Sequence, residues 1–564
     1  MLVADGRLTP IGDDTFSVSG DLGVLAVPDT LRALIASRLD GLDPADRGLL
    51  QDAAVLGKTF GVDALAAISG QAAETLEPRL KPLVKRELLE ISVDPRSPER
   101  GQYGFVQSVI REVAYDTLSR RDRRGRHLAA ARYFEGLGDD ELASVLSTHY
   151  LAAYRSSDEG PEADALQIQA RLALRGAAER ALALGATDQA LSCFNQALEI
   201  TTETTDRAEL LEQAALSADL EGRYAEAEEL GFKSLEAFEA AGDRTGAARV
   251  SALMGGILAD ASKPTEAVEF LEEALAKAER PEDAEYRADM LARLSRAHMR
   301  LSENEAAIRR ADEALAIAEP LRLDRVIAEA FVNKAAALGA ARRWREPVVL
   351  MEAAIRLASE IGDVALELRA RNNLAAVLGA EDGDRAWEVA HEAYELAIRL
   401  GVRQMSAWII GALGWGAMYY GRDWDEAIAG LDAEIEVSVS DADRGRLLGI
   451  RENLMAWRGE DRSSITSERE RLTSVTSDPE MAVWSTLYGA IDDLLAGRPA
   501  TAVEGFRACA VTTFQNTADA RFGLVLAAQL AGDPDVARES VEQADQEDYG
   551  GRSIEAMKVL ARAG

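Results

Sequence analysis

Residues 303–319 read Glu-Asn-Glu-Ala-Ala-Ile-Arg-Arg-Ala-Asp-Glu-Ala-Leu-Ala-Ile-Ala-Glu, and this stretch decides the fold. Its small residues Ala307, Ala311 and Ala314 are four and three positions apart, so they share one face of a predicted helix. A face of small side chains lets a neighbouring helix approach closely. The stretch therefore predicts a helix that packs tightly against its neighbours.

The same face recurs along the chain at a nearly constant spacing. Similar triplets stand at Ala190/Phe194/Ala197, Ala227/Gly231/Ser234, Ala267/Leu271/Ala274, Pro347/Met351/Ala354, Ala386/Ala390/Ala393, Ala427/Leu431/Glu434, Ala502/Phe506/Cys509 and Ala537/Val541/Ala544. Successive triplets are 37, 40, 40, 40, 39, 41, 75 and 35 residues apart, and we interpret the 75 as two periods with a degenerate copy near Ser464–Leu472. A period near 40 is typical of a solenoid, in which each unit buries its apolar face only against the next.

Residues 165–564 resemble tetratricopeptide repeats with long loops. In that family the triplet belongs to the second helix of each pair, and a small residue twelve positions earlier belongs to the first helix. Small residues at that distance precede three of the triplets: Gly255, Ser295 and Ala335. The resemblance implies a mainly α fold, with a right-handed solenoid of about nine or ten helix pairs. It also implies that the first helices line an inner surface able to bind a protein or peptide.

The N-terminal region carries a second resemblance. Residues 27–42 read Val-Pro-Asp-Thr-Leu-Arg-Ala-Leu-Ile-Ala-Ser-Arg-Leu-Asp-Gly-Leu and predict a helix that Gly41 ends. They resemble the boundary between the ATPase core and the winged helix in bacterial STAND-class signalling ATPases, including those fused to nucleotidyl cyclase domains and those in large transcriptional activators. The resemblance implies that residues 1–42 are a remnant of the ATPase lid and its connecting helix, and that the nucleotide-binding core is absent from this chain.

The next segment, residues 43–119, is predicted to be a winged helix. Its helices are expected at Pro44–Leu56, Val62–Ile68 and Ala72–Lys85. Strands are expected at Leu88–Val93 and Gln102–Val106, joined by a turn rich in Pro and Gly. Residues 120–164 are predicted to be linking helices that lead to the repeat array.

Composition disfavours nucleic acid and membrane surfaces as partners. The chain has 63 basic and 97 acidic residues, a net charge of −34, which repels nucleic-acid phosphate and anionic membranes. Cys193 and Cys509 are the only cysteines and are predicted to be buried thiols, in keeping with a reducing cytoplasm. The N-terminus lacks a secretory pattern, and the longest uncharged stretch, Ala407–Gly421, is too short to span a bilayer. These features predict a cytoplasmic protein.

No residue pattern predicts a catalytic or cofactor site. Gly57-Lys58-Thr59 invites a phosphate-loop assignment, but Asp52 stands where that motif needs its first glycine. We therefore interpret the stretch as a structural turn. The four histidines lack metal-motif spacing. The sequence predicts no enzyme, no cofactor and no metal; an ATPase or cyclase activity would belong to a longer parent protein.

Two sets of residues are candidates for binding by the array. On the expected first helices, Asn and Arg side chains could bind a peptide carboxylate or backbone: Arg249, Arg296, Asn333, Arg369 and Asn372. Trp408 and Trp415 share a helix face, with glycines between them that could leave an apolar groove. For both sets, a solvated face or ordinary packing between repeats stays open as the alternative.

A basic cluster follows the predicted wing and consists of Arg120, Arg121, Arg123, Arg124 and Arg126. It could dock on an ATPase core or contact DNA backbone. Our first hypothesis is a non-catalytic arm that binds a protein, a peptide or a small effector and relays this to an ATPase core in cis or in trans. The alternatives are a DNA-binding transcriptional regulator acting through the winged helix, and a fragment whose activity is that of a parent ATPase or cyclase.

Overall fold

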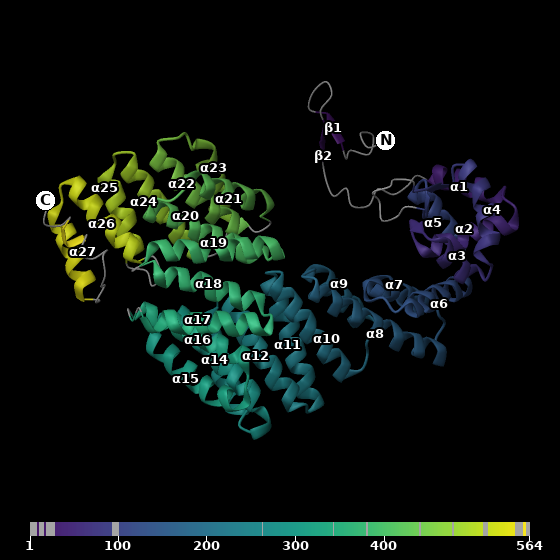
Figure 1. Cartoon of the computed structure of the whole chain (residues 1–564), viewed down its shortest axis with the longest axis horizontal. Helices are drawn as coiled ribbons and strands as arrows, with labels where there is room; N and C mark the ends of the chain where they lie inside the picture. Colours follow the sequence, from purple (N-terminus) through teal and green to yellow (C-terminus); the bar gives the residue numbers. More distant parts are fainter. Residues whose placement is uncertain are drawn as a thin grey trace. The chain divides into compact units, whose positions relative to one another are not determined.

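The computed structural model describes residues 8–10, 16–18, 29–92, 101–261, 263–341, 343, 345–379, 382–438, 441–475, 479–510, 517–546 and 557–559. The chain divides into two compact units, Met1–Asp206 and Arg207–Gly564. Figure 1 shows helices throughout both units, with only short strands near the N-terminus.

Unit 1 begins with two short strands, β1 (Leu8–Pro10) and β2 (Phe16–Val18), which pair antiparallel. The helix predicted at residues 27–42 is present as α1 (Asp29–Asp40). The elements that follow are α2 (Pro44–Leu56), β3 (Thr59–Phe60), α3 (Val62–Ser69), α4 (Ala73–Lys85), β4 (Leu89–Ile91), β5 (Tyr103–Phe105) and α5 (Ser108–Asp116). The expected helices and strands of residues 43–119 are therefore confirmed within two residues, and β3 and α5 are additions. The turn predicted between the two strands lies mostly outside the described residues.

These elements share one apolar core. The three strands form an antiparallel sheet in the order β3-β5-β4. Phe105 at its centre is fully buried, together with Leu65 of α3 and Leu76 of α4. Helix α1 adds Ile35 and Leu39 to the same cluster, so it packs as part of this module.

The Gly57-Lys58-Thr59 stretch is a turn, as predicted. Helix α2 ends at Leu56, Gly57 adopts a φ of +131°, and β3 begins at Thr59. Asp52 lies inside α2, largely buried, and accepts a hydrogen bond of 2.6 Å from Arg126 Nε. Its carboxylate therefore fastens helix α6 (Arg120–Leu137) to α2.

A buried histidine pair joins the last helices of this module to those that follow. Tyr115 Oη lies 2.9 Å from His127 Nε2, and His127 Nδ1 lies 3.0 Å from Nδ1 of His149 on α7 (Ala143–Arg155). Neutral rings satisfy both contacts if Tyr115 donates to His127 and His127 donates to His149. Burial, and for His127 also the neighbouring His149, lower the pKa of His127 to about 3 and of His149 to about 4.

The histidine pair predicts acid destabilisation of unit 1. Because both folded pKa values lie below the unfolded value near 6.5, the unfolded state binds more protons in between. Stability is therefore full above pH 6.5 and falls as pH drops toward 4, by about 1 kcal/mol per pH unit for each histidine. Thermal melts across this pH range measure the predicted loss of stability. In a His127→Phe/His149→Phe double variant, this part of the pH dependence should disappear; a dependence unchanged from wild type would contradict the explanation.

The repeat array starts in unit 1 with the pair α8 (Pro161–Ala183) and α9 (Thr187–Glu199), and continues through unit 2. The first helices of the later pairs are α10 (Thr204–Leu220), α12 (Arg244–Asp260), α14 (Ala284–Arg300), α16 (Asp324–Ala340), α18 (Val364–Leu378), α20 (Arg403–Tyr420), α22 (Asp441–Arg458), α24 (Pro479–Leu495) and α26 (Thr517–Ala531). The second helices are α11 (Tyr224–Ala241), α13 (Pro264–Lys277), α15 (Asn304–Leu321), α17 (Arg345–Ile361), α19 (Gly383–Leu400), α21 (Trp424–Val437), α23 (Ser463–Val475), α25 (Pro499–Ala510) and α27 (Pro534–Gln546). The described chain thus holds ten pairs, and the degenerate copy is α23.

The small residues lie at the contacts between helices, as the spacing predicted. Ser295 of α14 donates a hydrogen bond of 2.7 Å to the carbonyl of Ala307 on α15. Gly255 of α12 packs directly against the side chain of Leu271 on α13, leaving no room for a Cβ. Ala307, Ala311 and Ala314 are all fully buried. Each helix pair is therefore closed by backbones that approach closely.

Both cysteines are free and buried, as predicted. Among the helices of the described residues, none combines the length and the apolarity that a membrane span requires.

Candidate functional site

The candidate site is the face formed by the first helices of unit 2. Their sixth residues occupy equivalent positions because successive helices start at intervals of 38 to 40 residues. We call this set the sixth-residue column. From α10 to α26 it consists of Glu209, Arg249, Asp289, Glu329, Arg369, Trp408, Arg446, Trp484 and Phe522.

Contacts between neighbouring first helices support this register. Asn333, tenth in α16, donates a hydrogen bond of 2.8 Å to the carbonyl of Ala292, ninth in α14. Tyr488, tenth in α24, packs its ring against Gly449, ninth in α22. The same pair of positions is thus in contact at two distant points of the array.

From α10 to α18 the column is charged, and Arg249, Asp289, Glu329 and Arg369 each take part in ion pairs. Arg369 Nη2 lies 3.3 Å from Glu329 Oε1. Arg325 lies 3.7 Å from the carboxylates of both Asp289 and Glu329. Burial alone would raise the pKa of Glu329, but the guanidinium groups of Arg369, Arg293 and Arg325 lower it below its usual range. This half of the column is therefore built from ion pairs between repeats.

Two of the predicted arginines take part in further pairs between first helices. Arg249 forms a bidentate pair with Glu212 of α10, with both N–O distances at 2.6 Å. Arg296 of α14 pairs with Asp260 of α12. Asp219 of α10 lies near this pair, and burial, together with the charge of Asp260, raises its pKa to about 7.

From α20 to α26 the column turns aromatic. Trp408 is 43% exposed, and the guanidinium carbon of Arg446 lies 4.4 Å from the centre of its ring. Arg446 is itself buried and fixed, since its Nη2 donates to the carbonyl of Ala407 at 3.1 Å. Phe522 at the end of the column is 36% exposed. A cation held under an aromatic ring stabilises the ring's position without covering it fully.

Trp415 belongs to a cluster beside the column. Its ring lies 6.0 Å from that of Trp484 and 6.2 Å from that of Tyr488, between centroids. Tyr488 is 1% exposed, and burial raises the pKa of its hydroxyl above its usual range. The cluster bridges α20 and α24 across α22, whose Gly449 makes room for the Tyr488 ring.

The two amides predicted to bind a ligand, Asn333 and Asn372, are buried or partly buried in the structure. Asn333 is not a surface ligand: its side chain is 1% exposed and its amide is used in the hydrogen bond to Ala292. Asn372 of α18 is partly buried, and its Oδ1 has no hydrogen-bond partner within the described part of the chain. Of the predicted array residues, Arg249, Arg369 and Trp408 lie in the sixth-residue column.

Sequence reasoning missed the partners of these residues. Glu329 and Arg446 are both in the column and buried, and no local motif distinguishes them from the other charged residues of α16 and α22. Trp484 and Phe522 lie beyond Asn372, the last residue that was predicted from the register of the first helices. Extending the 40-residue step would have found them, since each follows its predecessor by 38 to 40 residues.

The basic cluster after the wing is largely occupied. Arg124 lies 3.0 Å from Glu162, Arg126 bonds Asp52, and Arg123 donates to the carbonyl of Asp116 at 3.2 Å while stacking over Tyr115. Arg120 donates to the carbonyl of Ser157 at 3.0 Å. Arg121 is exposed and forms no hydrogen bond or ion pair within the described residues 101–261. The cluster thus chiefly fixes α6 to its neighbours.

No group of three or more His, Cys, Asp or Glu side chains among the described residues is arranged to hold a metal ion.

Comparison with protein-family models gave no match, and comparison with curated protein sequences gave none. Among solved structures, the chain is similar to a STAND protein with a tetratricopeptide repeat sensor, PH0952 from Pyrococcus horikoshii, at 13% identity and a TM-score of 0.35, covering 96% of this chain and 68% of that one. It is similar to Rap protein complexed with competence and sporulation factor at 15% identity and a TM-score of 0.40, covering 71% of this chain and 96% of that one. It is similar to yeast Tom70 at 13% identity and a TM-score of 0.36, covering 77% of this chain and 96% of that one.

These similarities are distant, and the fold assignment rests on the helix pairs themselves. Ten antiparallel pairs at a regular step, closed by small residues, define unit 2 and the end of unit 1 as a tetratricopeptide-like α-solenoid.

Proposed function

We propose that this chain is a non-catalytic binding arm, whose repeat array takes up a peptide segment of a protein partner on the sixth-residue column. The observation that carries the proposal is the aromatic half of the column. Trp408 and Phe522 leave large apolar surfaces exposed on first helices, although most apolar side chains of the array are buried. Tryptophan and arginine are enriched among the residues that contribute most of the binding energy at protein interfaces, and Trp408 stacks on Arg446.

The charged half of the column supports the same function in a different way. Arg325, Glu329 and Arg369 are already paired with each other, so they stiffen the face and present a neutralised surface. A rigid face loses little entropy on binding. We therefore expect the partner's apolar side chains to dock at α20–α26, while its polar backbone crosses α12–α18.

A selection experiment tests this proposal. A display library of random linear peptides, panned against the full chain, is expected to enrich sequences with aromatic or aliphatic anchors. Trp408→Ala should weaken the selected peptides on the order of 10- to 100-fold, because truncating a central Trp removes a dominant contact. The control is Trp457→Ala: Trp457 is 53% exposed on α22 but lies outside the column. Equal losses in both variants, or no enrichment at all, would refute the proposal.

We further propose that unit 1 couples the array to a nucleotide-binding core supplied in cis or in trans. The order α2-β3-α3-α4-β4-β5, with three antiparallel strands in the order β3-β5-β4, supports the predicted winged helix. In the neighbouring helix α6, Arg124 and Arg126 form ion pairs within the chain, which reduces the positive charge available for DNA contact. Purified chain should bind no ATP at millimolar concentration. ATP hydrolysis that is lost in Lys58→Ala would overturn the non-catalytic assignment.

A further inference from the structure

The repeat α12–α13 departs from the regular pattern at one point. The second helices α11, α13 and α15 start at Tyr224, Pro264 and Asn304, forty residues apart. However, α11 and α15 each have 18 residues, whereas α13 has 14. Helix α13 is therefore one turn shorter at its C-terminal end.

A proline and a buried ion pair follow the shortened helix. Pro281 stands where the last residue of a full-length helix would be, and a proline disfavours the helical conformation of the residue before it. Arg280 is extended, with φ −76° and ψ 152°, and the chain continues as the short helix η2 (Pro281–Asp283). Asp283 is buried and holds Arg280 through two hydrogen bonds of 2.6 and 2.9 Å. This pairing lowers the pKa of Asp283 and fixes the non-helical path.

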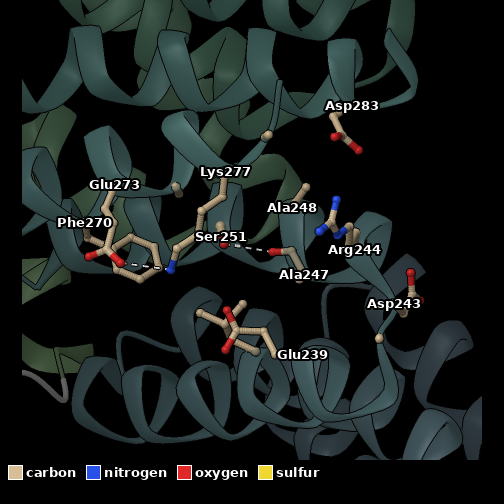
Figure 2. Close-up of a pocket in the computed structure, with 14 residues that line it drawn as sticks. Glu239, Asp243, Arg244, Ala247, Ala248, Ser251, Phe270, Glu273, Lys277 and Asp283 are labelled. Atoms are coloured by element: carbon tan, nitrogen blue, oxygen red, sulfur yellow. Dashed lines mark hydrogen bonds and ion pairs between the residues drawn. The ribbon is translucent and has the colours of Figure 1, made fainter. Parts of the chain in front are cut away.

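The shortened helix borders a pocket of about 430 Å³ between α11, α12 and α13 (Figure 2). Its apolar lining comes from Leu235, Ala247, Ala248, Phe270, Ala274 and Ala278. Figure 2 shows the charged side chains of Glu239, Arg244, Glu273 and Lys277 around it. The volume lies in the range of pockets that bind small molecules.

Most polar groups of the pocket are already bonded. Lys277 Nζ lies 2.9 Å from Glu273, and this bond raises the pKa of Lys277. Asp243 Oδ1 accepts from the backbone N–H of Gly246 at 2.9 Å, and Ser251 Oγ donates to the carbonyl of Ala247 at 2.8 Å. These groups shape the walls and leave little bonding capacity for a ligand.

Glu239 and Arg244 are different. Both residues are exposed, and neither side chain has a hydrogen bond or an ion pair with another residue in the described range 101–261 or 263–341. Arg244 acts on Asp283, and Glu239 on Lys277, only through their charges. Glu239 lies in the last turn of α11 and Arg244 is the first residue of α12. The pocket thus presents one uncommitted carboxylate and one uncommitted guanidinium beside an apolar wall.

We infer that this pocket binds a small zwitterion that carries an ammonium and a carboxylate beside an apolar side chain. The ligand's carboxylate pairs with Arg244, its ammonium with Glu239, and its side chain packs on Phe270 and Ala274. A free amino acid and a short peptide share this chemistry. The site lies between α11, α12 and α13, and none of its lining residues belongs to the sixth-residue column, so this inference stands or falls separately from the proposed partner binding.

Calorimetric titration of the full chain tests the inference with matched probes. The zwitterions are L-leucine and L-leucyl-L-leucine, which separate the free amino acid from the peptide. The single-charge analogues are 4-methylpentanoate and 3-methylbutylamine. One zwitterion is expected to bind, and each analogue should bind at least about tenfold more weakly, since each lacks one charge-assisted pairing. Failure of both zwitterions to bind at millimolar concentration would overturn the inference.

Variants assign the two charges. Arg244→Gln should weaken the zwitterion at least about tenfold and abolish the chain's preference for it over the amine. Glu239→Gln should also weaken the zwitterion at least about tenfold, and it should abolish the preference for the zwitterion over 4-methylpentanoate. Arg309→Gln, an exposed arginine on α15, is the matched control and should bind as wild type does. Unchanged affinity in both pocket variants would overturn the assignment, and Trp408→Ala should leave zwitterion binding intact.

Discussion

Replacing Arg469 by methionine is expected to lower the free energy of unfolding of the C-terminal repeats by about 3–5 kcal/mol. Arg469 of α23 and Glu452 of α22 are 4% and 1% exposed, and Arg469 Nε lies 2.6 Å from Glu452 Oε2. Arg469 also donates to Ser485 Oγ of α24 at 3.0 Å. Arg469→Met would leave Glu452 buried without its cation, and an uncompensated buried charge is strongly destabilising. Denaturant unfolding followed by hydrogen exchange in α22–α24 measures the loss.

The control for this prediction removes both charges. Glu452→Leu combined with Arg469→Met replaces a buried ion pair by apolar side chains, which is often close to neutral. The double variant should therefore recover most of the stability that the single variant loses. A single variant that loses less than about 1 kcal/mol would show that the pair is not buried as described.

Replacing Phe506 by alanine is expected to cost about 3–5 kcal/mol, and the cost should be local. Phe506 of α25 is 2% exposed, and its ring fills the space left by Gly523 on α26. In a solenoid each unit is stabilised mainly by its neighbours, so hydrogen-exchange protection should fall in α24–α27 and stay unchanged in α14–α17.

Phe522→Ala is the matched control for Phe506→Ala. Phe522 is on α26 as well, but it is 36% exposed and leaves no buried cavity when truncated. Its loss should change stability by less than about 1 kcal/mol. An equal loss of protection along the whole array in Phe506→Ala would contradict the nearest-neighbour account.

The sequence predicted the architecture of the array because that architecture depends on local spacing. Ala307, Ala311 and Ala314 recur at a step near 40, and the structure places such residues where helices meet. Even α23 was expected, from the 75-residue interval alone. The shortened α13 was not, although Pro281 was its visible signal. The domain bounds of residues 1–42, 43–119 and 120–164 and the ATPase resemblance stay predictions.

The candidate site could be predicted only in part because it depends on contacts between repeats. Arg369 and Trp408 were found as residues, but their partners Glu329 and Arg446 are set by the register of one first helix on the next. The position in the helix decides the partner. Asn333, tenth in α16, donates a hydrogen bond to the carbonyl of Ala292 on the preceding first helix, whereas Glu329, sixth in α16, pairs with Arg369 on the next one.

The most direct test of the central claim is hydrogen exchange of the full chain with a selected peptide bound. If the array binds its partner on the sixth-residue column, protection should increase in the first helices α20, α22, α24 and α26. The second helices α21, α23 and α25 and the helices of unit 1 should exchange as in the free protein. Protection confined to the second helices, or to unit 1, would contradict the account.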